Sequence, residues 1–126
     1  MGGGKRILLV EDDEAIRQLI VEILADAGYE VIAATNGRDG LRRVAVWRPD
    51  LILLDKLMPE SDGTMFAREY RATDGPHAPI VAMCAARDGR EWSDEIGAAS
   101  FVIKPFDIDM LLDAVRAQLD READRV

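Results

Sequence analysis

The sequence predicts one α/β domain built on a doubly wound parallel sheet. Strand-like and helix-like patterns alternate five times along the 126 residues, with no internal repeat, linker or low-complexity tract between them. Short apolar runs bounded by polar residues are typical of strands buried on both faces. Three such runs end in charged residues: 7–10 before Glu11-Asp12-Asp13, 51–54 before Asp55, and 101–103 before Lys104-Pro105.

These charges predict a ligand site, because open α/β sheets bind ligands beyond the carboxyl ends of their strands. If the three strands are neighbours, their ends gather two or three carboxylates and one ammonium within a few ångströms. Carboxylates held that close repel one another unless a cation joins them. The pattern therefore indicates a hard divalent metal together with an anionic substrate.

Composition narrows the class of protein. Hydrophobic residues make up 48% and charged residues 32%, which is ordinary for a globular domain. The net charge of -8 argues against direct nucleic-acid binding, which needs a basic face. No apolar stretch approaches the ~20 residues of a membrane span, and there is no signal-peptide pattern. The single cysteine excludes an internal disulfide and fits a reducing compartment, so we expect a cytoplasmic protein.

The first half of the chain predicts two strands and two helices. A strand at 6–10 precedes a helix that ends at Gly28, a usual residue just past a helix C-terminus. A second strand covers 29–34, and Asn36 then caps a helix running to about Trp47. Apolar side chains at helical spacing form one face of the first helix: Ile16, Leu19, Ile20, Ile23 and Leu24.

The second half repeats this alternation. The third strand is expected at 51–55, followed by a loop at 58–63 and a helix to about Thr73. The fourth strand is expected at 79–84, where small residues suit a packed centre. The helix between 86 and 96 is the weakest element, because only Trp92 and Ile96 are large and apolar and Gly89 disfavours helix by ~1 kcal/mol.

The chain ends with a strand at 100–104 and a helix capped by Asp107. That helix carries one apolar stripe: Ile108, Leu111, Leu112, Val115 and Leu119. The expected domain organisation is a flexible lead-in at 1–4, the domain itself at 5–121 and a polar, frayed tail at 122–126.

The acidic residues fit a Mg²⁺ site, for which Mn²⁺ can substitute. Mg²⁺ takes one or two carboxylates, keeps several waters and leaves room for phosphate oxygens. Asp12 and Asp55 are expected to bind it directly and Glu11 through a water. A backbone carbonyl just after Asp55, at Leu57, completes the set. Asp13 is expected to cap the first helix instead.

Asp55 has a second possible role as a nucleophile. A lone carboxylate at the end of an apolar strand is costly as mere scaffolding, and carboxylates form aspartyl phosphates in phosphoryl transfer. That reaction needs a metal and a fixed cation for the growing charge. Lys104 supplies the cation, and the turn set by Pro105, with a cis bond, would aim it over the strand ends.

These motifs together resemble a response-regulator receiver domain, over nearly the whole chain. The resemblance implies a flavodoxin-like (βα)5 fold with strand order 2-1-3-4-5 and helices on both faces. It implies that Asp55 accepts a phosphoryl group, with Mg²⁺, from a histidine kinase or histidine phosphotransfer protein. It also makes Lys104 the phosphate partner. The motifs are Val10-Glu11-Asp12-Asp13, Leu54-Asp55-Lys56-Leu57-Met58-Pro59 with Asp62-Gly63, and Gly97-Ala98 leading through Phe101 to Lys104-Pro105-Phe106.

The chain departs from the family pattern at several positions. Cys84 stands where the family has Ser or Thr, and a thiol is a weaker donor to a phosphoryl group. By itself Cys84 fits a small, inert, buried strand residue, with redox sensing as the less favoured alternative. Phe101 occupies the aromatic switch position without a hydroxyl. Leu57 and Ala86 flank the approach to the acceptor and cannot orient a water, which predicts a long-lived aspartyl phosphate. The stretch 84–97 is slightly shorter than typical.

We therefore expect a single receiver domain that is a phospho-acceptor rather than an enzyme and that signals by conformational change, either alone or as a piece of a longer regulator. A pseudo-receiver that binds partners without taking phosphate is one alternative, to which Cys84 points. A metal-dependent phosphatase is another, but it needs a second acid where Leu57 stands. Trp47, Lys56 and Trp92 fit surface or packing roles.

Overall fold

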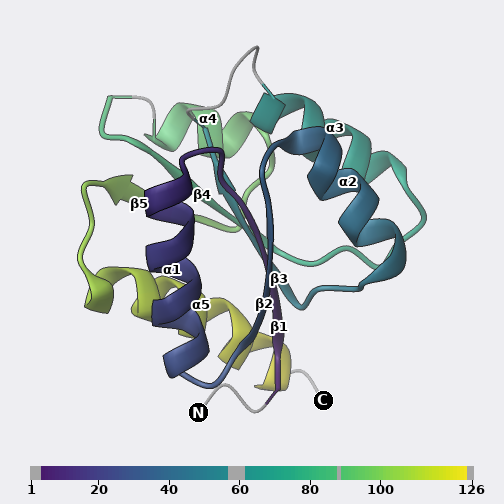
Figure 1. The fold of residues 1–126 in the computed structure, drawn as a ribbon. Helices are drawn as coiled ribbons and strands as arrows, with labels where there is room; N and C mark the ends of the chain where they lie inside the picture. Colours follow the sequence, from purple (N-terminus) through teal and green to yellow (C-terminus); the bar gives the residue numbers. More distant parts are fainter. Residues whose placement is uncertain (1–3, 57–61, 88, 125–126) are drawn as a thin grey trace.

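The computed structural model describes residues 4–56, 62–87 and 89–124. Five parallel strands form one sheet in the order β2-β1-β3-β4-β5 and alternate with five helices, as predicted (Figure 1). The elements in chain order are β1 Arg6–Val10, α1 Glu14–Asp26, β2 Glu30–Ala34, α2 Gly37–Val46, β3 Leu51–Asp55, α3 Asp62–Ala72, β4 Ile80–Ala85, α4 Gly89–Glu95, β5 Ser100–Lys104 and α5 Ile108–Asp124.

The sheet separates two apolar cores, because side chains alternate along each strand. Ile7 and Leu9 of β1 pack toward α1 and α5, whereas Leu8 and Val10 pack toward α2, α3 and α4. All four side chains are fully buried. Figure 1 shows α1 and α5 together on one side of the sheet and α2 with α3 on the other. Burial on both faces is the reason that β1 and β3 are apolar at nearly every position.

Local capping sets where the helices begin. The side chains of Asp13, Asn36 and Asp107 each accept a hydrogen bond from the backbone N–H three residues later, at 2.9, 2.8 and 2.8 Å. These are the N-caps expected from the sequence. Gly28 follows α1 with φ of +97°, the left-handed conformation that glycine adopts without strain.

Several predicted boundaries were wrong. β2 begins at Glu30 rather than at 29, and β4 spans Ile80–Ala85 rather than 79–84. Pro79 has no N–H to donate, and only its carbonyl pairs with the sheet, accepting from Ile52 N. Helix α3 already includes Asp62 and Gly63, which were expected in a loop, while 58–61 lie outside the described residues. Helix α5 spans Ile108–Asp124.

Two residues of the predicted apolar stripes are not in the core. Leu19 of α1 is 55% exposed and Ile108 of α5 is 53% exposed, although the other residues of each stripe are buried or partly buried. Helical spacing identifies the side of a helix that faces the sheet, but it does not say how wide the covered strip is. Within the described ranges, no helix is both long and apolar enough to cross a membrane.

Candidate functional site

The carboxyl ends of β1, β3 and β5 bring the predicted charges together. Glu11 and Asp12 directly follow β1, Asp55 is the last residue of β3, and Lys104 is the last residue of β5. β1 and β3 are direct neighbours, with Val10 paired to Leu54, so their ends lie level. The strand order reverses between these two strands, where doubly wound proteins bind their ligands.

The side chains of this edge are in close contact. Lys104 Nζ lies 2.6 Å from Asp55 Oδ1 and 3.5 Å from Glu11 Oε1. One carboxylate oxygen each from Glu11, Asp12 and Asp55 lie within 4.8 Å of one another. The structure thus assembles all four charged residues that the sequence placed at this edge, with the Lys104–Pro105 bond in the cis form.

The four charged side chains differ in their exposure to solvent. The side chains of Glu11 and Asp55 are 1% exposed, Lys104 is 19% exposed, and Asp12 is open to solvent. A ligand from solution therefore meets Asp12 first and reaches Asp55 behind it. This arrangement suits an ion that keeps part of its hydration shell.

The electrostatics of the site show that it lacks positive charge. Burial, and then the Asp55 carboxylate, raise the pKa of Glu11 from its ordinary 4.5 to about 7. Burial also acts to lower the pKa of the Lys104 ammonium. The hydrogen bond that Lys104 donates to Asp55, together with the charges of Asp55 and Glu11, outweighs burial and raises this pKa above its ordinary value.

A divalent cation fits this deficit. Glu11 Oε1 is a buried oxygen with no hydrogen-bond partner among the described residues, although buried polar atoms are normally satisfied. It faces the carboxylates of Asp12 and Asp55. Three hard oxygen donors, one of them unsatisfied, are a donor set for Mg²⁺-like ions rather than for softer metals. Leu57, the expected carbonyl ligand, lies outside the described residues.

Arg17 holds the turn that carries the acidic pair, and sequence reasoning missed it. Its Nη1 donates to the carbonyl oxygens of Glu11 and Asp12, at 3.1 and 3.2 Å. The backbone N–H of Asp13 donates to Glu11 Oε2 at 3.2 Å, which leaves Oε1 for the cluster. The only sequence signal was a basic residue one turn into the helix after an acidic run, which most surface helices share.

The predicted switch positions lie on the two strands after β3, Cys84 on β4 and Phe101 on β5. Cys84 is fully buried near the end of β4, in register with Ile103 of β5. Phe101 is half-buried, packs on the core under α4, and has the Arg90 guanidinium 6.0 Å from its ring centre. Ala86, just after β4, is exposed.

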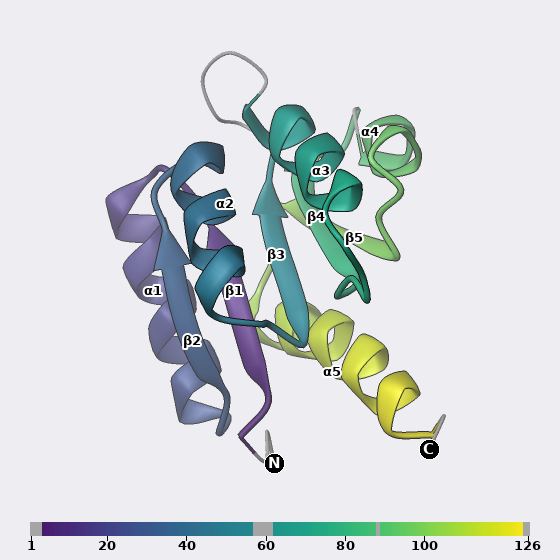
Figure 2. The same ribbon diagram turned by 90° about the vertical axis from the view of Figure 1, so that its right-hand side faces the viewer.

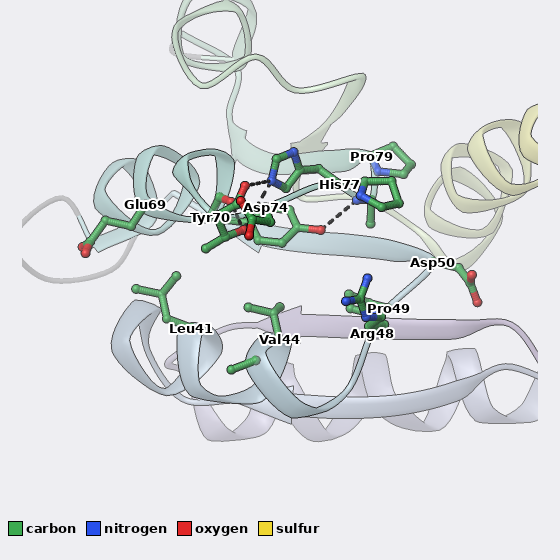
Figure 3. A pocket seen from close by; sticks show the side chains of 14 residues that line it. Leu41, Val44, Arg48, Pro49, Asp50, Glu69, Tyr70, Asp74, His77 and Pro79 are labelled. Carbon is green, nitrogen blue, oxygen red and sulfur yellow. Dashed lines mark hydrogen bonds between the residues drawn. The ribbon is translucent and has the colours of Figure 1, made fainter.

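A separate groove of about 720 Å³ lies at the opposite end of the sheet (Figure 3). Leu41 and Val44 point from α2 toward α3, and the Tyr70 hydroxyl accepts a 2.7 Å hydrogen bond from Ala78 N. Asp50 directly precedes β3, so the groove lies at the amino end of that strand. None of the four charged residues at the carboxyl edge lines it.

Fold and site together define a class: a doubly wound α/β domain with an acidic cluster suited to a cation, and a lysine fixed beside it, at its switch point. The chain belongs to the response regulator receiver domain family of two-component signalling, whose model matches residues 7–116. The acidic cluster is typical of the Mg²⁺ site of receivers, which take phosphate from histidine kinases or phosphotransferases.

Named relatives agree with this assignment. Response regulator MprA of Mycolicibacterium vanbaalenii is 40% identical over 119 residues, which cover 92% of this chain and 51% of that protein. Sporulation initiation phosphotransferase F of Bacillus subtilis is 37% identical, covering 91% of this chain and 94% of that protein. The chemotaxis response regulator CheY4 of Vibrio cholerae superposes with a TM-score of 0.84 at 30% identity, covering 92% and 99%. The chain spans about half the length of MprA and of several other curated relatives that it matches.

Glu11 should make the stability of the cation-free protein depend on pH. Its pKa is about 7 in the folded chain and 4.5 ordinarily, so the folded state binds the proton more tightly. This stabilisation is complete below the unfolded pKa and is lost as the pH rises through 7. We expect the free energy of unfolding of wild type, measured with urea in EDTA, to fall by on the order of 2–3 kcal/mol between about pH 5.5 and about pH 8. This fall should be absent in Glu11→Gln. An equal fall in both proteins would contradict the role of Glu11 in the pH dependence.

Arg17→Gln should weaken Mg²⁺ binding about tenfold, as loss of a residue that orients metal ligands commonly does. Removing positive charge alone would strengthen binding, so the sign of the change separates positioning from simple electrostatics. Titration of Mg²⁺ followed by amide NMR shifts measures the effect. Arg42→Gln makes the same charge change on exposed α2 and serves as the control. Tighter binding in Arg17→Gln would show that the contact with the turn is unimportant.

Proposed function

We propose that Asp55 accepts a phosphoryl group from a phosphohistidine, carried by a histidine kinase or a histidine phosphotransfer protein, and that Mg²⁺ takes part. The chain then signals by a change of conformation. The observation that carries the proposal is the 2.6 Å contact between Lys104 Nζ and Asp55 Oδ1 inside a buried acidic cluster. Such a contact fixes a nucleophilic carboxylate and places an ammonium where phosphoryl charge arrives.

The chemistry needs little from the protein beyond this placement. A carboxylate oxygen of Asp55 attacks phosphorus, and a P–O bond forms as the P–N bond to the donor histidine breaks. The imidazole nitrogen keeps the electron pair of the broken bond. Lys104 stays protonated, because its pKa is raised, and donates to a phosphoryl oxygen.

Mg²⁺ is the metal we propose for the cluster. Asp12 and Asp55 would bind it directly and Glu11 through a water, with the Leu57 carbonyl as a further ligand. When bound, the ion neutralises charge on the phosphoryl oxygens. The turn held by Arg17 keeps Glu11 and Asp12 on the same side of Asp55, so the chain itself sets where the cation lies.

A surface for the donor protein adjoins the site. An apolar groove of about 890 Å³ runs from Lys104 between α1 and the start of α5. The half-exposed Leu19 and Ile108 line this groove. A phosphohistidine must come within bonding distance of Asp55, so its carrier has to cover the surface next to Lys104. Apolar side chains exposed there favour a protein carrier over a small phosphodonor.

Phosphorylation of Asp55 can be tested directly. Incubation with acetyl phosphate and Mg²⁺ should add one phosphoryl group, measured by intact mass, and EDTA should prevent it. Asp55→Asn should lose the label, because an amide oxygen is a poor nucleophile. Asp13→Asn is the matched control, since Asp13 caps α1 outside the cluster and should leave labelling intact. Labelling that survives in Asp55→Asn would overturn the acceptor assignment, and no labelling of wild type would favour the pseudo-receiver.

Cys84→Thr should strengthen the response to phosphorylation with little effect on its rate. A hydroxyl offers a shorter and better directed hydrogen bond to a phosphoryl oxygen than a thiol does. Amide shifts of residues 85–87, compared with and without beryllofluoride, measure the response. Cys84→Ala, which has neither group, should respond no more than wild type. Identical shifts in the threonine variant and wild type would mean that residue 84 does not limit the coupling.

A further inference from the structure

Helix α4 packs on β4 and β5, and one of its side chains also links it to α3. Its described range is only seven residues, and Trp92 is its one large buried side chain, 3% exposed. Trp92 belongs to the same core as Phe66 of α3. Both helices lie near the carboxyl end of β3 in Figures 1 and 2. Trp92 therefore connects the short helix to α3 as well as to the sheet.

A hydrogen bond fixes the indole against α3. Trp92 Nε1–H donates to Thr64 Oγ1 at 2.9 Å. The indole N–H can only donate, and in a buried position its loss of a partner is unfavourable. The ring is therefore locked in orientation as well as packed. Thr64 lies in the first turn of α3, shortly after the segment that follows Asp55.

Gly63 joins this ring to the acceptor residue itself. A methyl group on the Gly63 Cα would lie 2.9 Å from the Asp55 carbonyl oxygen and 3.0 Å from Cζ2 of Trp92. The glycine backbone thus fills the space between the acceptor and the indole, with no room for a further carbon atom. Groups packed this closely cannot move independently, so a shift of one must displace the next.

A second contact ties the far end of α4 to the same helix. The Arg71 guanidinium of α3 donates from Nε to the Ile96 carbonyl at 3.2 Å and from Nη2 to the Gly97 carbonyl. Ile96 and Gly97 directly follow α4. Contacts from α3 therefore reach α4 at its middle and just after its last residue, so α3 and α4 are joined at two points.

We infer that Trp92 is a positioning residue for Asp55, and that occupancy of the acceptor site changes the position of α4 through Gly63 and Thr64. The inference rests on the proposed phosphorylation of Asp55. Cys84 and Phe101 lack a hydroxyl group that could link the acceptor site to α4. The contact of Trp92 with Gly63 and Thr64 does not require a hydroxyl group at either switch position. Coupling between two sites is reciprocal, so loosening Trp92 must also alter binding at Asp55.

Indole fluorescence tests this inference. The chain has two tryptophans, and Trp47 lies beside Arg6 at the start of β1, so Trp47→Phe leaves Trp92 as the only indole. Titration of this protein with beryllofluoride and Mg²⁺ should shift the Trp92 emission. Thr64→Val in the same background should abolish most of the shift and weaken beryllofluoride binding about fivefold, the low end of ordinary coupling between sites.

Matched variants separate coupling from loss of folding. Thr73→Val removes a threonine hydroxyl just after α3, bonded to the Tyr70 carbonyl, and should leave beryllofluoride affinity unchanged. Trp92→Phe keeps an aromatic ring but loses the N–H, and amide shifts should show the same weakening as in Thr64→Val. Wild-type affinity in both variants, or an unchanged Trp92 emission in protein whose Asp55 accepts phosphate, would overturn the inference alone. Failure of Asp55 to accept phosphate in wild type would overturn the proposed function and the inference with it.

Discussion

The ion pair between Lys104 and Asp55 is the interaction on which the geometry of this edge depends. Two buried carboxylates lie close together there, and Lys104 contacts both of them. β4 lies between β3 and β5, so the lysine side chain has to cross the end of β4 to reach Asp55. The last residue of β4 is Ala85, a small residue in register with Lys104. The contact therefore depends on Lys104, on Asp55 and on a small residue at the end of the strand between them.

Two sets of contacts support the carboxyl edge of the sheet, one at the acidic turn and one near helix α4. Arg17 holds the backbone of the turn through its carbonyls, leaving the carboxylates directed at the cluster. On another side of Asp55, Gly63 lies between the Asp55 backbone carbonyl and the Trp92 ring. Neither support touches the reacting oxygen atoms. Both act on backbone position, and small shifts of backbone at such a site have large effects on reactivity.

Sequence patterns predicted the order of the elements and the charged residues at the carboxyl edge, because both follow from short-range rules. Apolar runs report burial on two faces, and a charge that ends such a run must lie at the edge of the sheet. The contacts of Arg17 and Trp92 could not be predicted in this way. Arg17 lies only five and six residues from its partners, but its pattern is one that most surface helices share. The Thr64–Trp92 bond spans 28 residues and depends on the tertiary packing. The exposure of Leu19 was missed for the same reason, since only the neighbouring elements decide how much of a helix is covered.

The sheet also divides the molecule into two compartments that can vary separately. The core beneath α1 and α5 and the core beneath α2, α3 and α4 have no buried residue in common. Substitutions around Leu19 and Ile108, on the surface proposed for the donor, can therefore be made without repacking Trp92 or Phe66. The reverse holds for changes in α3 and α4. A domain partitioned like this can exchange its upstream partner and its downstream response independently, which makes it a suitable unit for gene duplication and for rewiring by design.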